Sequence, residues 1–374
     1  RALGLLPMAD CEGLAAAYIF LRDVEHRVQV THGLQTHELP ADPHSLTVLA
    51  RKMGFQREGG RNERETFLEA LRNHQELVSR VFQNLFRKED AGEAAQRPRP
   101  EEGPAAAAET LEDSLSPADL APYDFADPVA ARAHLRLLRN GEPFQHVSAR
   151  AKRLFDELIP RVLYLTLDMP DPDRAVVNLN RFVEKGGGRE AVFTLLAEQE
   201  NILGVLLRLF ASSDYLSDIL LAQPGLLDPL FRTEALTASK DAGTLAAELA
   251  ADALRASGAA QRFVRLCAAK RGEELAIGLR SLLGEADILQ TLRDLTAVAE
   301  AVVAAGHRIA YEELVSLHGT PIEEETGAPA GFSVIGMGKL GSREMNFGSD
   351  LDLVFLYSRP GATDGRAGEH PAKR

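Results

Sequence analysis

Residues 332–357 read Phe332-Ser-Val-Ile-Gly-Met-Gly-Lys-Leu-Gly-Ser-Arg-Glu-Met-Asn-Phe-Gly-Ser-Asp-Leu-Asp-Leu-Val-Phe-Leu-Tyr357. Two apolar runs flank a glycine-rich connection, and the second run opens with Asp350 and Asp352. This order is typical of a strand, a loop that can hold phosphate, and a second strand. Because side chains alternate between the two faces of a strand, we predict that Asp350 and Asp352 share one face.

The aspartate pair predicts a divalent cation site. Two neighbouring carboxylates repel each other unless solvent or a cation neutralises them. Mg²⁺ is commonly held by one or two carboxylates together with substrate phosphates. Two such ions can activate an attacking oxygen and stabilise a leaving one in a phosphoryl-type displacement. We therefore predict that Asp350 and Asp352 bind Mg²⁺ and are catalytic.

The glycine-rich loop is predicted to hold nucleotide phosphates. Glycine lets backbone N–H groups approach a phosphate closely, and neighbouring hydroxyl and cationic side chains add donors. The predicted nucleotide-binding residues are Gly336, Gly338, Lys339, Gly341, Ser342 and Arg343.

Three other structures share part of this pattern. The spacing of Gly336, Gly338 and Gly341 matches the dinucleotide-binding fingerprint, but that fingerprint needs a crossover helix of about a dozen residues before the next strand. A P-loop needs a Gly-Lys-Ser/Thr ending, which the sequence lacks here. The third alternative is an ordinary hairpin with a solvated acidic edge, which the attached glycine loop makes the less favoured one.

At these residues the chain resembles known families. A Gly-Ser loop followed by Ser349-Asp-x-Asp-Leu is similar to the DNA polymerase beta-type nucleotidyltransferase superfamily. The longer string from Gly336 to Leu356 closely resembles bacterial glutamine synthetase adenylyltransferases. Further stretches extend this resemblance over nearly the whole chain, among them residues 18–27, 34–40, 212–216 and 223–228.

The resemblance implies an enzyme that uses ATP and Mg²⁺ to add AMP to a tyrosine of glutamine synthetase. In that family a second catalytic half removes the AMP by phosphorolysis. Glutamine synthetase and the PII signal protein are the implied partners. By position, the resemblance makes Asp350 and Asp352 metal ligands and places Gly341, Ser342 and Ser349 in the nucleotide-binding loop.

Two other functions remain open from the sequence. The first is a uridylyltransferase that modifies the PII signal protein, which belongs to the same superfamily. The second is a helical regulatory or scaffold segment without catalytic activity. Labelled ATP or UTP, offered with glutamine synthetase or PII, distinguishes the two enzymes. Loss of Mg-ATP binding in an Asp350→Asn variant distinguishes an enzyme from a scaffold.

Composition narrows the class of protein. The chain has 374 residues, 45% apolar, with 6% aromatic residues and no tryptophan, which favours helices over sheets. A formal net charge of −13 argues against a nucleic-acid binder. Cys11 and Cys267 lie far apart, which favours free thiols in a reducing cytoplasm. No uncharged apolar run reaches about 18 residues, so no membrane partner is expected.

We predict a mainly α protein: helical bundles followed by the truncated start of an α+β, polymerase beta-type nucleotidyltransferase domain. Apolar residues at helical spacing predict helices at about 14–30, 44–53, 63–87, 190–210, 243–256, 260–283 and 287–317. The predicted domains are a helical bundle at 1–88, which resembles the tail of an upstream catalytic half, a flexible linker at 89–115, an all-helical domain at 116–328 and the start of the transferase domain at 329–374.

The chain is expected to be a piece of a longer protein. It begins at Arg1 rather than methionine, and the residues after Tyr357 show no strand pattern that carries an acidic residue. A two-metal transferase usually needs a third carboxylate on a neighbouring strand. We therefore expect that carboxylate to lie outside the chain and the chain alone to be inactive.

Overall fold

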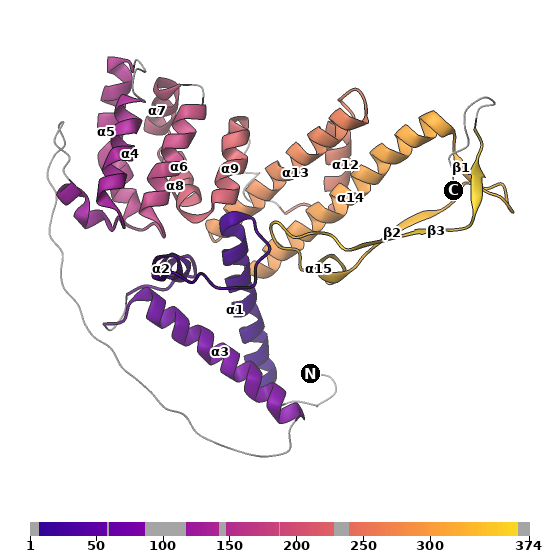
Figure 1. Ribbon diagram of the computed structural model, residues 1–374, viewed down its shortest axis with the longest axis horizontal. Coiled ribbons are helices and arrows are strands. Elements are labelled where there is room, and N and C mark those ends of the chain that lie inside the picture. Colours follow the sequence, from indigo (N-terminus) through magenta and orange to yellow (C-terminus); the bar gives the residue numbers. More distant parts are fainter. Residues whose placement is uncertain are drawn as a thin grey trace. The chain divides into compact units, whose positions relative to one another are not determined.

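The computed structural model describes residues 7–57, 60–86, 117–141, 147–186, 188–227 and 239–365. The chain forms two compact units, Arg1–Leu227 and Asp228–Arg374, and each is described by itself. Helices dominate both units, which confirms the mainly α fold (Figure 1). The predicted linker at 89–115 lies outside the described residues, and the predicted boundary at 328 falls inside the second unit.

The first unit is helical throughout its described part. It contains α1 (Met8–His32), α2 (Pro43–Lys52), α3 (Glu63–Phe86), α4 (Pro128–Asn140), α5 (Ala149–Thr166), α6 (Pro172–Lys185), α7 (Arg189–Glu198), α8 (Glu200–Ser212) and α9 (Asp214–Ala222), with short 3₁₀ segments at Pro117–Tyr123 and Pro224–Leu226. The predicted single helix at 190–210 is wrong, because Gln199 leaves the helical conformation (φ −117°, ψ 80°) between α7 and α8. Apolar spacing continues across such a break and therefore does not reveal it.

Local sequence explains where several of these helices begin. Asp42, Asp127 and Asp171 each precede a proline at the first helical turn, and each accepts backbone N–H groups from that turn. A capping carboxylate satisfies donors that have no partner within the helix, and proline fits the first turn because it has no N–H to satisfy.

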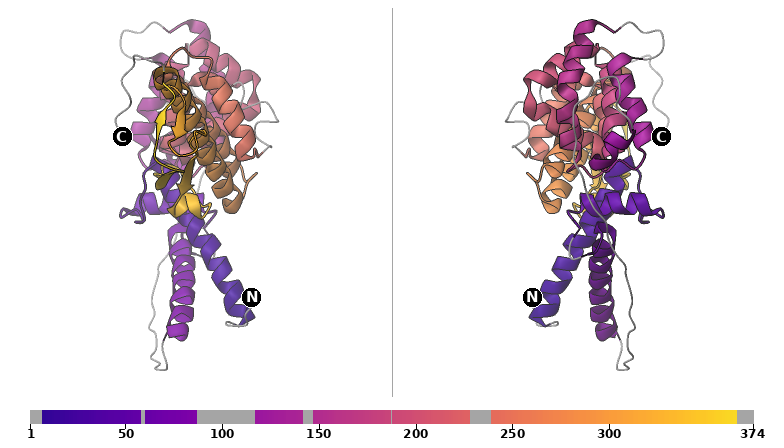
Figure 2. Two further views of the ribbon diagram at one scale, coloured as in Figure 1. Left: turned by 90° about the vertical axis from the view of Figure 1, so that its right-hand side faces the viewer. Right: turned by 90° about the vertical axis from the view of Figure 1, so that its left-hand side faces the viewer.

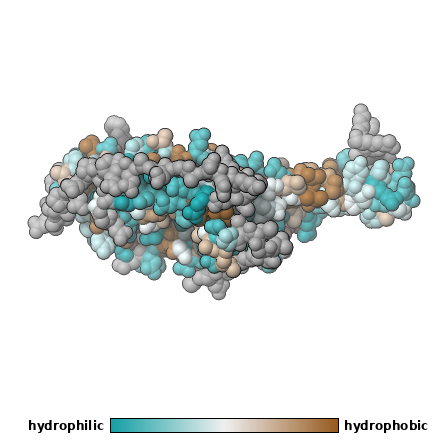
Figure 3. Space-filling model, turned by 90° about the horizontal axis from the view of Figure 1, so that it is seen from below, coloured by the Kyte–Doolittle hydropathy of each residue, from teal (hydrophilic) through white to brown (hydrophobic). Residues whose placement is uncertain are grey.

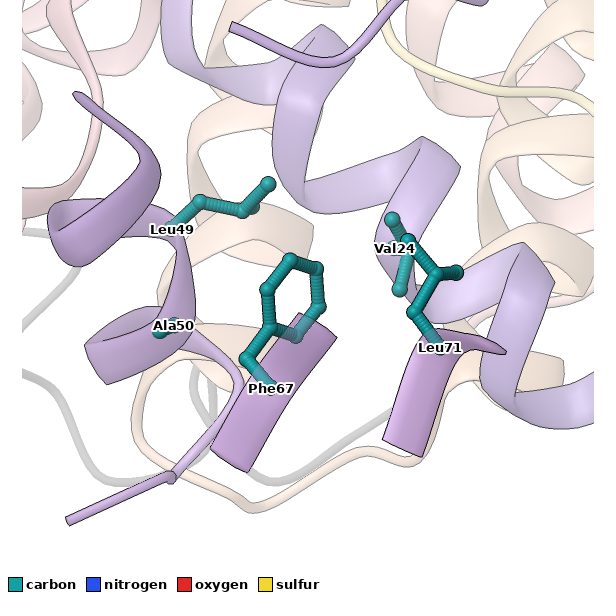
Figure 4. Close-up of a cluster of buried hydrophobic side chains, with 5 residues drawn as sticks. All are labelled: Val24, Leu49, Ala50, Phe67 and Leu71. Atoms are coloured by element: carbon teal, nitrogen blue, oxygen red, sulfur yellow. The ribbon is translucent and has the colours of Figure 1, made fainter. Parts of the chain in front are cut away.

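The first three helices share an apolar core. Its buried members are Val24, Leu49, Ala50, Phe67 and Leu71 (Figure 4). Helix α1 also contacts α9. The hydroxyl of Ser213, the residue that caps the start of α9, donates to the Val30 carbonyl on α1 at 2.5 Å. The first three helices thus belong to the same unit as the central ones.

The described part of the second unit begins with three packed helices. These are α12 (Ala242–Ala253), α13 (Ala259–Leu282) and α14 (Ile288–His318), which lie side by side (Figures 1 and 2). Their buried charges are paired: Arg280 Nη2 lies 2.8 Å from Asp294 Oδ2, and Asp294 Oδ1 accepts from Ser239 and Gln290. Pairing and hydrogen bonding are what make buried charges tolerable.

Two small antiparallel sheets complete the second unit. Strand β1 (Pro321–Glu323) pairs with β4 (Gly361–Thr363), and β2 (Phe332–Gly336) pairs with β3 (Leu353–Tyr357). Between β2 and β3 the chain makes one short helix, α15 (Gly338–Gly341). This confirms the predicted strand, glycine loop and strand.

The predicted position of the aspartates on a strand is wrong. Strand β3 begins at Leu353, so Asp350 and Asp352 lie in the connection just before it. Asn346 to Ser349 form a turn, with Gly348 at φ +67°, and this turn delays strand pairing.

The β2–β3 hairpin exposes apolar side chains on both faces. Ile335, Val354, Phe355, Leu356 and Tyr357 are all exposed, and apolar surface gathers at this hairpin (Figure 3). Such continuous apolar strands are typical of sheets that are covered on both faces.

No helix in the described part of the chain combines the length and the apolar character that crossing a membrane requires.

Candidate active site

The two aspartates lie at the loop end of the β2–β3 hairpin, directly before β3. Both side chains are exposed, and the Met337 N–H donates to the Asp352 carbonyl at 2.8 Å. This bond continues the ladder one step past Gly336 and Leu353, so it fixes the backbone of Asp352 against the start of the glycine loop.

Gly338 brings the glycine loop against the Asp352 carboxylate. Its φ is +52°, a conformation that favours glycine, and a Cβ atom there would lie 2.6 Å from Asp352 Oδ2. Any side chain at 338 would push the carboxylate away. The structure thus brings Gly338, a predicted nucleotide-binding residue, next to Asp352, a predicted metal ligand.

Gly336 and Gly341 allow close packing within the loop. A Cβ on Gly336 would lie 2.7 Å from the Leu340 side chain, and a Cβ on Gly341 would lie 2.8 Å from the Gly336 carbonyl. The N–H groups of Gly341 and Ser342 donate within the helical turn, to Met337 and Gly338. Their predicted role in binding phosphate stays a prediction, and the structure adds a packing reason for these glycines.

The polar side chains of the loop point in different directions. The Ser342 hydroxyl donates to the Lys339 carbonyl at 3.3 Å. Arg343, at φ +61°, places Nε 3.7 Å from Glu300 Oε1 on α14. Ser349 is partly buried, and its hydroxyl oxygen has no partner among the described residues.

A cavity of about 490 Å³ lies between α14 and the inner face of the hairpin. Arg343, Glu300 and His307 contribute polar groups to it, and His307 stacks on Phe332 with ring centroids 4.9 Å apart. Neither aspartate is among its described lining residues. Arg343 therefore faces this cavity, and the structure does not bring it to the aspartates.

Sequence reasoning missed the segment that anchors the loop. Met345 and Phe347 are buried, with exposed fractions of 4% and 0%, and the Met345 N–H donates to Thr296 Oγ1 on α14 at 3.2 Å. The alternation Met345-x-Phe347, directly before the acidic pair, is the signal that could have revealed it.

The aspartates fit a cation that is shared with a phosphate ligand. Within the described residues, no group of three or more His, Cys, Asp or Glu side chains could hold a metal. Two exposed carboxylates beside a glycine loop match the way Mg²⁺ is held with a nucleotide, by one or two carboxylates and phosphate oxygens. They do not match an all-protein cage of the calcium type.

Two protein-family models match the chain. The model described as glutamate-ammonia ligase adenylyltransferase matches residues 203–373, which include the hairpin and both aspartates. The model described as GlnD PII-uridylyltransferase matches residues 1–86, which include only α1, α2 and α3 among the elements described.

Curated relatives match along nearly the whole chain. One from Neisseria meningitidis serogroup A is 29% identical over 359 residues, which is 96% of this chain and 38% of the relative. One from Pseudomonas aeruginosa is 30% identical over 360 residues, 95% of this chain and 36% of the relative. One from Nitrosococcus oceani is 31% identical over 365 residues, 95% of this chain and 37% of the relative.

Each of these relatives is named a bifunctional glutamine synthetase adenylyltransferase/adenylyl-removing enzyme. The chain spans between 36% and 38% of their length. The similarity along nearly all of the chain, and the family model that covers the hairpin, show that this chain belongs to the glutamine synthetase adenylyltransferase family.

Proposed function

We propose that the protein containing this chain is an ATP- and Mg²⁺-dependent adenylyltransferase that adds AMP to a tyrosine of glutamine synthetase, and whose other half removes it. The observation that carries this proposal is the approach of Gly338 to the Asp352 carboxylate, with 2.6 Å between the carboxylate and an added Cβ. A phosphate held by the loop then lies next to the residue that holds the metal.

In this proposal each part of the hairpin has one task. Asp350 and Asp352 hold Mg²⁺, which supplies charge neutralisation for the triphosphate when bound. Gly336, Gly338, Lys339, Gly341, Ser342, Arg343 and Ser349 form the nucleotide-binding loop. The β2–β3 ladder and the Met345 anchor keep loop and carboxylates in register, so the nucleotide meets preformed geometry.

The domain assignment, the PII partner and the location belong to the same proposal. Residues 1–88 then form the helical tail of one catalytic half, 116–328 the central helical domain, and 329–374 the start of the other half. PII is a second protein partner. The cytoplasm is the proposed location, in keeping with the two free thiols, Cys11 and Cys267.

The comparisons favour adenylyl transfer over uridylyl transfer to PII. The uridylyltransferase match is confined to residues 1–86, whereas the match that contains the hairpin is to the adenylyltransferase family. Residues 1–86 contain neither Asp350 nor Asp352, and they contain no part of the glycine loop.

The test uses the full-length protein with labelled ATP or UTP and with purified glutamine synthetase or PII. We expect label from ATP on glutamine synthetase, lost in Asp352→Asn and kept in Asp168→Asn, an exposed aspartate of the first unit. Label from UTP on PII would support the uridylyltransferase instead. Equal labelling of glutamine synthetase by the wild-type and Asp352→Asn proteins would contradict the proposed role of Asp352 in the active site.

A further inference from the structure

The four residues before Asp350 form a tight turn. The Ser349 N–H donates to the Asn346 carbonyl at 3.4 Å, and Gly348 between them has φ +67°. A turn of this kind brings its first and fourth residues close together. Asn346 and Ser349 are therefore neighbours, and Asp350 extends directly from the turn.

Both end residues of the turn carry buried polar atoms without a partner. Asn346 is 4% exposed, and neither its Oδ1 nor its Nδ2 bonds to any described residue. The Ser349 hydroxyl oxygen is also buried and unpartnered within the described chain. Buried polar groups are nearly always hydrogen-bonded, so two such groups in one turn need an explanation.

The N-terminal side of the turn is held by contacts, whereas the C-terminal side leads into an exposed residue. On the N-terminal side, Met345 is bonded to Thr296, and Phe347 is fully buried. On the C-terminal side, Asp350 is exposed. A displacement of Asp350 would therefore reach Ser349 before it reached Asn346, which lies between the bonded Met345 and the buried Phe347.

We propose that Asn346 is a positioning residue of the candidate metal site. When Mg-ATP is bound, the Asn346 amide and the Ser349 hydroxyl bond to each other and hold the turn so that Asp350 points at the metal. This inference rests on the proposed function, and it adds a residue that does not itself touch the nucleotide.

The Asn346 amide and the Ser349 hydroxyl are complementary hydrogen-bonding groups. An amide offers both donors and an acceptor, and a hydroxyl is donor and acceptor, so one bond satisfies an atom on each side. Drawing two repelling carboxylates onto one cation shifts Asp350, and the turn bond then stabilises the shifted position. Groups that orient a metal ligand in this way affect metal affinity strongly.

The variants Asn346→Leu, Ser349→Ala and the double variant test this in the full-length protein. A buried polar group without a partner can be replaced by an apolar one of similar shape at little or no cost. We therefore expect the thermal midpoint without nucleotide to be unchanged or higher in each variant. Asn180→Leu, at an equally buried asparagine of α6, is the matched control.

With ATP present, each variant should need about tenfold more Mg²⁺ for half-maximal thermal stabilisation. The double variant should need no more than either single one, because both remove the same bond. The control should match the wild type. Ser349→Ala removes only a hydroxyl and keeps the test valid if Asn346→Leu does not fold.

Three results would overturn the assignment: a midpoint lowered by several degrees in Asn346→Leu or Ser349→Ala without nucleotide, an unchanged Mg²⁺ requirement, or effects that add in the double variant. The first would mean that the amide or the hydroxyl already has a partner, such as an ordered water. If the wild type is stabilised by Mg-ATP but Asn346→Leu behaves identically, only the role of Asn346 is lost. If the wild type neither binds Mg-ATP nor transfers AMP, the proposed function is lost as well.

Discussion

At the scale of single residues, the candidate site depends on charge and on the absence of side chains. Asp350 and Asp352 supply two exposed carboxylates, and Gly338 supplies the space in front of one of them. These two requirements are independent, so they are tested by different substitutions.

Asp350→Asn and Asp352→Asn should each abolish AMP transfer by the full-length protein. Each removes one of two neighbouring carboxylates, which weakens cation binding and relieves repulsion between them. The thermal midpoint should therefore stay within a degree or two of the wild type. Loss of folded, soluble protein in both variants would instead indicate a structural role.

Gly338→Ala should reduce transfer sharply at a small cost in stability. Its left-handed backbone costs alanine about 1 kcal/mol, and the new Cβ displaces the Asp352 carboxylate, which lies 2.6 Å from it. Gly327→Ala is the matched control, with φ +66° and nothing within 4 Å of the added Cβ. Similar activity in the two variants would show that the approach of Gly338 to Asp352 is unimportant.

At the scale of elements, α14 supports the site and α2 makes the first unit sensitive to pH. Thr296 on α14 accepts the Met345 N–H, which ties the glycine loop to a helix. Lys52, at the end of α2, donates to Thr31 Oγ1 on α1 at 3.0 Å. Each is a contact between elements that no local pattern reveals.

Thr296→Val should destabilise the second unit by about 1–3 kcal/mol, because the buried Met345 N–H loses its acceptor. Thr291→Val is the matched control. Thr291 is also buried on α14 and bonds the carbonyl four residues back, but it accepts no bond from the loop. Urea unfolding should give a lower free energy of unfolding for Thr296→Val than for Thr291→Val. Equal values would show that the bond from Met345 adds nothing beyond the bond that each threonine makes within α14.

Lys52 should make the stability of the first unit rise with pH. Burial is the main cause that lowers the pKa of Lys52 from 10.5 to about 7. Asp171 opposes this shift, and Arg174 and Arg27 contribute to it. Between about pH 7 and pH 10, Lys52 is therefore mostly neutral in the folded state, whereas in the unfolded chain it is mostly protonated. Stability should increase between about pH 7 and pH 10 and level off below about pH 7.

Urea midpoints at about pH 7 and about pH 9 measure this slope. Lys52→Met should flatten it and raise the midpoint near pH 7. Lys185→Met, at an exposed lysine of α6, should leave the slope unchanged. An equal slope in the wild type and Lys52→Met would assign the pH dependence to other groups.

At the scale of the whole molecule, the β2–β3 hairpin keeps apolar side chains that the described residues of its own unit leave exposed. Phe355 is 60% exposed and Tyr357 69% exposed, and within the described residues no third carboxylate joins the aspartate pair. The candidate site therefore has a glycine loop and two proposed metal ligands. The described residues supply neither a cover for the exposed strands nor a third carboxylate.

The isolated 374-residue chain should therefore fold as helical units and show no AMP transfer to glutamine synthetase. Its rate with labelled ATP should equal that of its own Asp352→Asn variant. A measurable rate above that background would mean that the described residues already form a complete site.

Much of this organisation could be predicted from the sequence, because it rests on short-range chemistry. An aspartate that caps the helix and the proline after it mark the starts of α4 and α6 in the sequence. Apolar spacing predicted α13 and α14. The glycine-rich string between two apolar runs predicted the β2–β3 hairpin, but not that both aspartates lie before its second strand. In each case the determining residues lie within a few positions of one another.

Other features were decided by tertiary structure. The turn at Asn346–Ser349 moved the aspartates off the strand, because Met345 and Phe347 pack into the core beside α14 rather than extend the ladder. Arg343 lies near Glu300, which stands 43 positions earlier in the chain, and not near the aspartates. The sequence by itself determined which residues could bind a metal and a phosphate, through their chemistry. Only the tertiary structure decided which of them meet, because such contacts join segments that no local periodicity relates.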